Sequence, residues 1–237
     1  MLPVAILAGG LATRLGSLTE KMPKSLVAID GEPFVAHQLR LLQRRGIERV
    51  ILCVGHLGEQ IERIVGNGRA FGVEVTYSYD GPTLLGTAGA IRTALPQLGE
   101  NFFVTYGDSY LVCDYAAVEH EFLRRRKLGL MTVFRNNGQW DVSNVEFEEG
   151  RILGYSKKNR TPRMRYIDYG LGVFRREAFQ GLPKGEPCDL AELYADLLRR
   201  KQLAAFEVQE RFYEIGSPEG LRETAEFLAA REAAQES

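Results

Sequence analysis

Residues 4–15 read VAILAGGLATRL, and the nearby stretch 23–26 reads PKSL. The run from Val4 to Leu7 is continuously apolar, which is typical of a strand buried on both faces of a parallel sheet. Two glycines follow it directly, so backbone N–H groups there can approach a ligand that a Cβ atom would exclude. Open α/β sheets bind ligands at the carboxyl ends of their strands. The stretch therefore predicts an α/β fold with a binding loop after the first strand.

Two cations, Arg14 and Lys24, follow this loop closely in the sequence. The fork of an arginine and the compact charge of a lysine both suit phosphate oxygens. The loop has neither the Walker spacing nor a GxGxxG pattern, and a tight turn would explain Gly9 and Gly10 if they stood alone. Together with the two cations, the glycines favour a phosphate-binding loop.

The first half of the chain alternates short apolar runs with helical patterns. This alternation predicts parallel βαβ units with helices on both faces of the sheet. We expect strands at 50–54, 73–79 and 102–106, and helices at 34–45, 57–65 and 88–95.

After Asp114 the strand candidates become shorter and polar stretches separate them, which indicates a more antiparallel part. Asp189 is the expected N-cap of a helix, and Ser217 followed by Pro218 opens the last one. The expected strands are 130–134, 144–147, 152–155, 166–174, 204–208 and 212–215, with helices at 115–127, 190–201 and from 218 onward.

Composition excludes several classes of protein. The 237 residues include 30 Lys plus Arg and 31 Asp plus Glu, so the net charge of -1 argues against a nucleic-acid binder. No apolar run approaches the ~20 residues of a membrane span, and the start lacks the basic residues of a secretion signal. Cys53, Cys113 and Cys188 are odd in number, widely spaced and without a C-x-x-C pair, which argues against structural zinc and against a disulfide framework. We expect a cytoplasmic protein, and no repeat or linker divides residues 1–237.

The segment 7–15 followed by Pro23 and Lys24 resembles the signature of the sugar-1-phosphate nucleotidylyltransferases. Ala12 departs from it, since many members have glycine there. The resemblance implies a Rossmann-like (GT-A-type) open mixed sheet, mainly parallel and flanked by helices, with a smaller antiparallel sugar-binding part. It implies a single domain, in which residues 1–113 form the nucleotide-binding half and residues 114–237 form the sugar-binding half and the C-terminal helix.

Residues 85–89, LGTAG, resemble the turn of this family that faces the base and ribose. Thr87 could alternatively serve only as the N-cap of the helix that follows. The resemblance implies nucleotide contacts from Leu7, Ala8, Gly9, Gly10, Thr13, Arg14, Lys24, Gly86, Thr87 and Ala88.

Two acidic residues match the metal ligands of the family. Asp108, in YGD at 106–108, follows a buried strand, where a carboxylate near two cations suits Mg²⁺. Residues 212–219, FYEIGSPE, resemble the stretch W-x-D-I-G-T-P-E, so Glu214 replaces the usual aspartate and Phe212 replaces tryptophan. The resemblance implies a Mg²⁺ site at Asp108 and Glu214. A generic turn aspartate and a plain strand-end glutamate are the alternatives.

The sugar side is expected further along the chain. Residues 152–158, ILGYSKK, fall where the family has Glu-Lys-Pro, so Lys157 is the expected ligand of the sugar phosphate, with Lys158 close behind. Asp168 and Gly170 fall where members of the family present a polar side chain or backbone to the sugar, and the resemblance implies that Asp108 contacts the sugar phosphate as well. A solvated basic loop at 157–165 is the alternative. Trp140 is expected to pack rather than to stack on a ligand.

The resemblance implies an enzyme that joins a sugar 1-phosphate to an NTP and releases pyrophosphate, for polysaccharide or glycoconjugate precursors. Arg14, Lys24 and Asp108 would be its catalytic residues, with Mg²⁺ as cofactor. The chain looks most like bacterial heptose- or hexose-1-phosphate guanylyltransferases, which favours GTP and leaves UTP, dTTP and CTP open.

Two other functions stay open at this point. One is a noncatalytic regulatory relative that binds sugar nucleotides. The other is a nucleotidyltransferase for a non-sugar acceptor such as phosphocholine or a pterin cofactor. No nucleic-acid or membrane partner is expected, and the sequence leaves open whether the chain forms a homo-oligomer.

Overall fold

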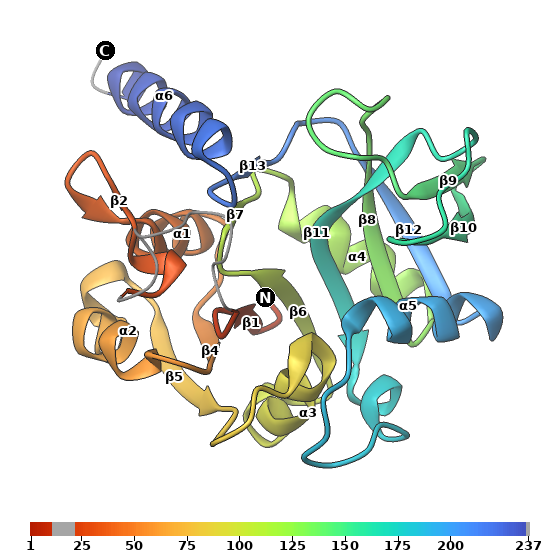
Figure 1. Ribbon diagram of the computed structural model, residues 1–237, viewed down its shortest axis with the longest axis horizontal. Helices are drawn as coiled ribbons and strands as arrows, with labels where there is room; N and C mark the ends of the chain where they lie inside the picture. The colour runs from red at the N-terminus through yellow and green to blue at the C-terminus, as the bar shows by residue number, and fades with distance from the viewer. Residues whose placement is uncertain (11–21, 236–237) are drawn as a thin grey trace.

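The computed structural model describes residues 1–10 and 22–235. Within them, the main sheet has nine strands, with the path β10-β9-β11-β6-β1-β4-β5 and with β8 and β12 attached at β11 (Figure 1). The strands are β1 (Val4–Leu7), β4 (Arg49–Val54), β5 (Glu74–Tyr79), β6 (Asn101–Tyr106), β8 (Gly129–Arg135), β9 (Val145–Glu148), β10 (Arg151–Tyr155), β11 (Tyr166–Arg175) and β12 (Leu203–Val208).

The first half of the chain forms the parallel part of the sheet. Strand β1 pairs in parallel with both β4 and β6, and β4 pairs in parallel with β5. The crossovers between these strands contain α1 (Phe34–Arg44), α2 (Gly58–Val65) and α3 (Gly86–Leu98). The predicted βαβ alternation is confirmed.

The second half makes the sheet mixed. Strand β11 pairs antiparallel with β6, β8 and β9, and β9 forms a hairpin with β10. Strand β12 pairs in parallel with β8. The predicted fold class, mainly parallel with a smaller antiparallel part, is confirmed. The helices of this half are α4 (Tyr115–Arg125), α5 (Leu190–Arg199) and α6 (Pro218–Gln235).

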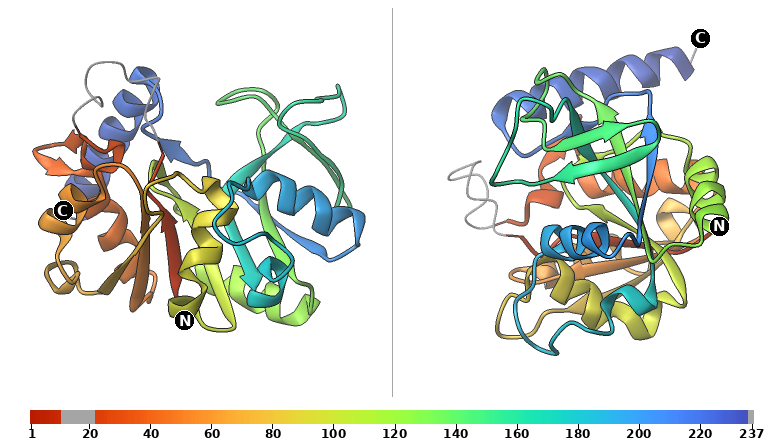
Figure 2. Two further views of the ribbon diagram at one scale, coloured as in Figure 1. Left: turned by 60° about the horizontal axis from the view of Figure 1, so that its bottom comes forward. Right: turned by 90° about the vertical axis from the view of Figure 1, so that its right-hand side faces the viewer.

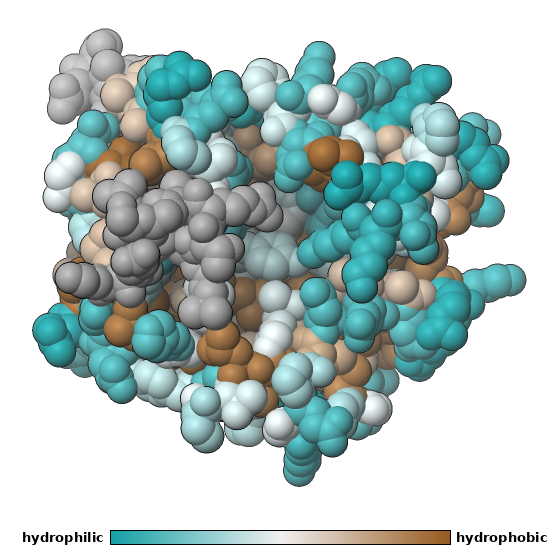
Figure 3. All heavy atoms as spheres, viewed as in Figure 1, coloured by the Kyte–Doolittle hydropathy of each residue, from teal (hydrophilic) through white to brown (hydrophobic). Residues whose placement is uncertain are grey.

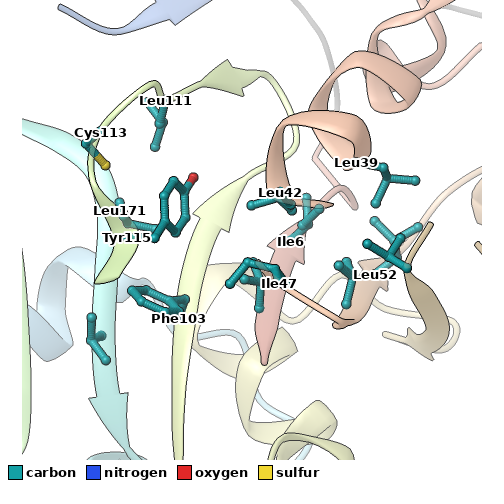
Figure 4. Packing of buried hydrophobic residues seen from close by; sticks show 14 of the residues in the cluster. Ile6, Leu39, Leu42, Ile47, Leu52, Phe103, Leu111, Cys113, Tyr115 and Leu171 are labelled. Carbon is teal, nitrogen blue, oxygen red and sulfur yellow. The ribbon is translucent and has the colours of Figure 1, made fainter. Parts of the chain in front are cut away.

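Buried side chains alternate between the two faces of the central strands, as the pleat of a strand requires. In β1, Val4 and Ile6 join the core under α1, α2 and α4, whereas Ala5 joins the core under α3 and α5. Figure 4 shows Ile6, on β1, and Phe103, on β6, within the first of these cores. Helices α3 and α5 lie side by side (Figure 2). Both faces of the sheet are therefore covered.

A small second sheet ties the end of the chain to the first half. Strand β7 (Ser109–Tyr110) pairs with β13 (Tyr213–Glu214), and α6 packs Leu228 into a third apolar cluster with residues of α1. A further hairpin joins β2 (Ala28–Ile29) to β3 (Glu32–Pro33). Short 3₁₀ helices lie at η2 (Lys24–Leu26), η3 (Arg69–Phe71) and η4 (Arg176–Phe179).

Helix ends test the capping predictions. Asp189 caps α5 by accepting a hydrogen bond from Ala191 N at 2.8 Å, and Ser217 Oγ accepts one from Gly220 N at 3.0 Å at the start of α6. Both predictions are confirmed. Helix α4 ends at Arg125, two residues earlier than predicted, because Arg126 adopts a left-handed φ of 54°.

Thr87 does not cap the helix that follows it, which was the alternative to its predicted nucleotide contact. Helix α3 already begins at Gly86 and has no side-chain cap, so Thr87 lies inside its first turn. The Thr87 hydroxyl instead accepts a hydrogen bond from Leu190 N at 2.7 Å. It therefore satisfies a free N–H group at the start of α5 and ties two distant helices together. Helix α3 also continues through Pro96 to Leu98, beyond its predicted end at 95.

Hydrophilic residues cover much of the face seen in Figure 3. No helix in the described ranges has the length and apolar character needed to cross a bilayer.

Candidate active site

The carboxyl ends of β1, β4 and β6 meet backbone to backbone at one edge of the sheet. Ala8 N donates to Cys53 O at 2.8 Å, and Gly107 N donates to Leu7 O at 2.9 Å. A Cβ atom on Gly9 would lie 2.9 Å from Gly55 N, which is closer than real Cβ contacts allow. Glycine is therefore required where the chain leaves β1.

A cavity of about 240 Å³ opens at this edge, which we call the glycine-walled cavity. Leu84, Ala90 and Gly107 are among its walls. Ala88, expected to line it, is fully buried, and its N–H donates to Cys188 O at 2.9 Å. Thr13 and Arg14 lie outside the described residues. The other expected nucleotide ligands do line it: Leu7, Ala8, Gly9, Gly10, Lys24, Gly86 and Thr87.

Asp80 lines the same cavity and was missed by the sequence analysis. It directly follows β5, so its place at the carboxyl end of a parallel strand was a usable signal. Its Oδ2 accepts a hydrogen bond from Leu85 N at 3.2 Å. Burial raises the pKa of Asp80, and the Leu85 N–H group opposes that shift.

A second cavity of about 580 Å³, which we call the polar cavity, lies beside the first. All five residues expected at the sugar phosphate, the sugar or the metal line it, namely Asp108, Lys157, Asp168, Gly170 and Glu214, whereas Lys158 does not. Strand β11 bulges between Asp168 and Gly172, and Gly170 has a φ of 97°. The left-handed backbone at Gly170 turns its N–H group toward Asp168 Oδ1, at 3.1 Å.

Asp168 lies in the wall of this cavity, at the bulge of β11. Burial raises its pKa, and the charge of Lys157 and the Gly170 N–H group pull the pKa down. Its backbone N–H group donates to Asn144 Oδ1 at 2.9 Å. Asn144 also lines the polar cavity, and no motif in the sequence pointed to it.

Lys24, Tyr106 and Asp108 line both cavities. Lys24 Nζ forms an ion pair with Asp108 Oδ2 at 2.8 Å, and the two side chains are 19% and 36% exposed. Lys157 Nζ lies 5.8 Å from the centre of the Tyr106 ring. A cation from each half of the chain therefore lies near the junction of the two cavities.

Glu214 is brought next to Asp108 by the pairing of β7 with β13. Ile215 N donates to Asp108 O at 2.9 Å. Glu214 Oε1 accepts a hydrogen bond from Ser217 Oγ at 2.8 Å, and Oε2 accepts one from Gly216 N. Since Mg²⁺ is commonly held by one or two carboxylates together with phosphates and water, the pair fits such an ion. A cluster of three or more His, Cys, Asp or Glu residues is absent from the described part of the chain.

Trp140 combines the expected packing with a place in the polar cavity wall. Its ring packs on Arg211, whose Cζ lies 3.5 Å from the ring centre, and the residue is 43% exposed. Arg211 also pairs with Glu223 of α6 at 2.6 Å. This wall of the cavity is thus linked to the C-terminal helix, which the sequence analysis missed.

The family model for nucleotidyl transferases matches residues 4–231. The chain belongs to this family. It is therefore a member of an enzyme family, the nucleotidyl transferases, and the resemblance inferred from the motifs is confirmed.

Curated relatives of the enzyme differ in base and sugar. This chain is 28% identical over 221 residues to the mannose-1-phosphate guanylyltransferase catalytic subunit beta of Xenopus tropicalis. The alignment covers 90% of this chain and 61% of that protein. The chain is also 28% identical over 241 residues to the N-acetylmuramate alpha-1-phosphate uridylyltransferase of Neisseria meningitidis, covering 95% and 97%.

Solved structures share the fold of this nucleotidyl transferase. HddC from Yersinia pseudotuberculosis, complexed with GMP-PN, superposes with a TM-score of 0.80 at 24% identity, covering 96% of this chain and 100% of that one. A putative glucose-1-phosphate thymidylyltransferase from Bacillus anthracis, in complex with a sucrose, gives 0.84 at 21% identity, covering 97% and 95%.

Proposed function

We propose that this enzyme transfers a nucleotidyl group from an NTP to a sugar 1-phosphate, giving an NDP-sugar and pyrophosphate. The observation that carries the proposal is the meeting of two cavities at Lys24, Tyr106 and Asp108. The glycine-walled cavity takes the NTP, and the polar cavity takes the sugar 1-phosphate. In this proposal residues 1–113 and 114–237 are the two halves of a single domain, and the product serves polysaccharide or glycoconjugate synthesis.

The chemistry asks mainly for positioning and charge neutralisation. An oxygen of the sugar phosphate attacks the α-phosphorus in line, and the bond to the β-phosphate oxygen breaks as pyrophosphate leaves. Lys24 Nζ, at the junction, stabilises the charge that grows on the α-phosphate. Lys157 fixes the sugar phosphate, while Asp168 and Gly170 contact the sugar. Arg14, outside the described residues, holds the β- and γ-phosphates.

Enzymes of the family are typically Mg²⁺-dependent. We assign the ion to Asp108 and Glu214, two carboxylates that line the polar cavity. When bound, Mg²⁺ neutralises phosphate charge during the transfer. The Gly216 N–H group and the Ser217 hydroxyl orient the Glu214 carboxylate, so the loop before α6 fixes where this longer side chain points.

Asp80 supports guanine as the base. A carboxylate only accepts hydrogen bonds, and the edge of guanine offers adjacent N1–H and N2–H donors. Uracil and thymine offer a single ring N–H beside two carbonyl oxygens, which a carboxylate would repel. GTP is therefore the favoured substrate, with UTP, dTTP and CTP as the competitors.

A matrix of the four NTPs against sugar 1-phosphates, scored by pyrophosphate release, tests the proposal. We expect release with GTP and a mannose or heptose 1-phosphate, and its loss in Lys24→Ala. Release only with CTP and phosphocholine, or with a pterin acceptor, would favour the non-sugar alternative. Nucleotide binding without release from any pair would identify a noncatalytic relative.

A further inference from the structure

A third cavity lies away from the candidate active site, where the last turns of α3 meet η4 and the loop after it. Its volume is about 560 Å³, within the range of roughly 300–1,000 Å³ typical of small-molecule sites. It shares no lining residue with the glycine-walled or the polar cavity. It is therefore a separate site.

The charged residues that line this cavity are all of one sign. Arg92, Arg176 and Lys184 line it, and no acidic residue does, although the whole chain has 31 acidic and 30 basic residues. Within the described residues, neither arginine forms an ion pair. No ion pair among the described residues therefore neutralises these two guanidinium groups.

The hydrogen bonds of the two arginines do not use up their donors. Arg92 donates to Phe179 O, and Arg176 donates to Leu95 O. In both side chains Nε is buried and has no hydrogen-bond partner among the described atoms. A guanidinium carries five N–H donors and a full charge, so the terminal nitrogens leave capacity for an anion beside the one hydrogen bond that each arginine makes here.

We propose that this third cavity binds a small metabolite that carries a phosphate group. The two arginines and Lys184 hold the phosphate, a task for which guanidinium and ammonium groups are suited. Thr93 and Gln180 offer neutral hydrogen bonds. Leu95 and Pro96 provide an apolar wall for the organic part of the molecule.

The position of the cavity connects it to the start of α3. The segment that leaves the cavity at Gly185 reaches Cys188, whose N–H donates to Leu85 O at 2.8 Å and whose carbonyl accepts from Ala88 N at 2.9 Å. A ligand in the third cavity, at the last turns of α3, would therefore contact the segment 185–188. The same segment is hydrogen-bonded to the first turn of α3, beside the glycine-walled cavity.

Calorimetric titration of the full chain with glucose 6-phosphate, and separately with inorganic phosphate, tests the proposal. We expect saturable binding of glucose 6-phosphate, weakened about tenfold by Lys184→Gln and by Arg176→Gln, as loss of a charged hydrogen bond predicts. Arg49→Gln is the matched control, because Arg49 also donates to the last turn of α3, at Gln97 O, but lies outside the cavity. Lys24→Ala controls for binding in the candidate active site, and both controls should stay within about twofold of the parent.

Three results would overturn the proposal. The first is an unchanged affinity for glucose 6-phosphate in Lys184→Gln, a substitution of an exposed residue. The second is loss of all binding of glucose 6-phosphate in Lys24→Ala. The third is the absence of saturable binding to the parent protein at glucose 6-phosphate concentrations up to about 10 mM. Inorganic phosphate binding as tightly as glucose 6-phosphate would contradict the part assigned to the apolar wall. Because binding is measured directly, the outcome does not depend on the reaction proposed for the other cavities.

Discussion

The glycine-walled cavity is shaped by backbone, whereas the polar cavity is shaped by side chains. A Cβ atom on Gly107 would lie 3.0 Å from Leu7 O, and one on Gly86, where φ is 69°, would lie 2.7 Å from Cys188 O. The walls of the polar cavity instead include the side chains of Lys157 and Asn144, from loops of the antiparallel part, and of Asp168, at the bulge of β11. The glycine-walled cavity should therefore tolerate few substitutions. Substitutions in the polar cavity should change which ligand it binds without disturbing the sheet.

Asp108 lines both cavities, so its substitution should have the largest effect on turnover. We expect Asp108→Ala to lower turnover on the order of 10³-fold, because several kcal/mol of charge neutralisation depend on this carboxylate. Pyrophosphate release at saturating Mg²⁺ measures it, with thermal unfolding as the check on folding. Asp196→Ala, which removes a surface ion pair with Arg199, is the control, and activity of Asp108→Ala within about threefold of the parent would contradict the assignment.

Lys157→Ala should weaken binding in the polar cavity and leave binding in the glycine-walled cavity unchanged. We expect the KM for the sugar 1-phosphate to rise by about tenfold or more, the effect of losing one charged hydrogen bond, while the KM for the NTP stays unchanged. Lys158→Ala is the matched control, because Lys158 is adjacent and exposed but does not line the cavity. Equal effects of the two substitutions would mean that the loop acts only through its total charge.

Substitutions in the wall of the glycine-walled cavity should instead change the stability of the protein. We expect Gly9→Ala to lower the free energy of unfolding by about 1–3 kcal/mol, the typical result of overpacking. Gly10→Ala should change it by less than about 0.5 kcal/mol, because no described atom lies within 4 Å of a Cβ placed there. Urea unfolding without nucleotide measures both, and equal stability of the two variants would contradict the role of backbone packing.

Glu214 should give the smallest effect, since it supplements Asp108. We expect Glu214→Gln to raise the half-saturating Mg²⁺ concentration roughly fivefold, about 1 kcal/mol, because the amide keeps the shape but loses the charge. Glu214→Asp should retain measurable activity. A Mg²⁺ titration of the initial rate measures both variants. Normal rate and unchanged half-saturation in Glu214→Gln would leave Asp108 as the only acidic ligand.

The parts of the fold that sequence predicted are those determined locally. Strands buried on both faces appear as continuous apolar runs, which identified Val4–Leu7 and its parallel neighbours. The caps at Asp189 and Ser217 depend on residues two or three positions away. The turn at Gly9 depends on the absence of a side chain, which the sequence shows directly.

The parts that sequence missed depend on contacts between distant segments. The Thr87 hydroxyl accepts a hydrogen bond from Leu190 N, 103 residues further along the chain, a contact that the local sequence around Thr87 does not show. The position of the Asn144 side chain depends on a hydrogen bond from the backbone N–H group of Asp168, on β11. The cationic third cavity combines residues of α3 with η4, whose proximity only the folded chain creates.

Because the glycine-walled cavity and the polar cavity join at Lys24, Tyr106 and Asp108, a single molecule that spans the junction occupies both at once. Once one end is bound, the other end is held near its own cavity at an effective concentration of millimolar order. The finished NDP-sugar is such a molecule, so in the proposed reaction it should be retained more tightly than either half alone. Inhibitors that tether a nucleoside to a sugar across this junction would draw on the same bivalency, and exchanging only their sugar end would tune them to relatives with a different polar cavity.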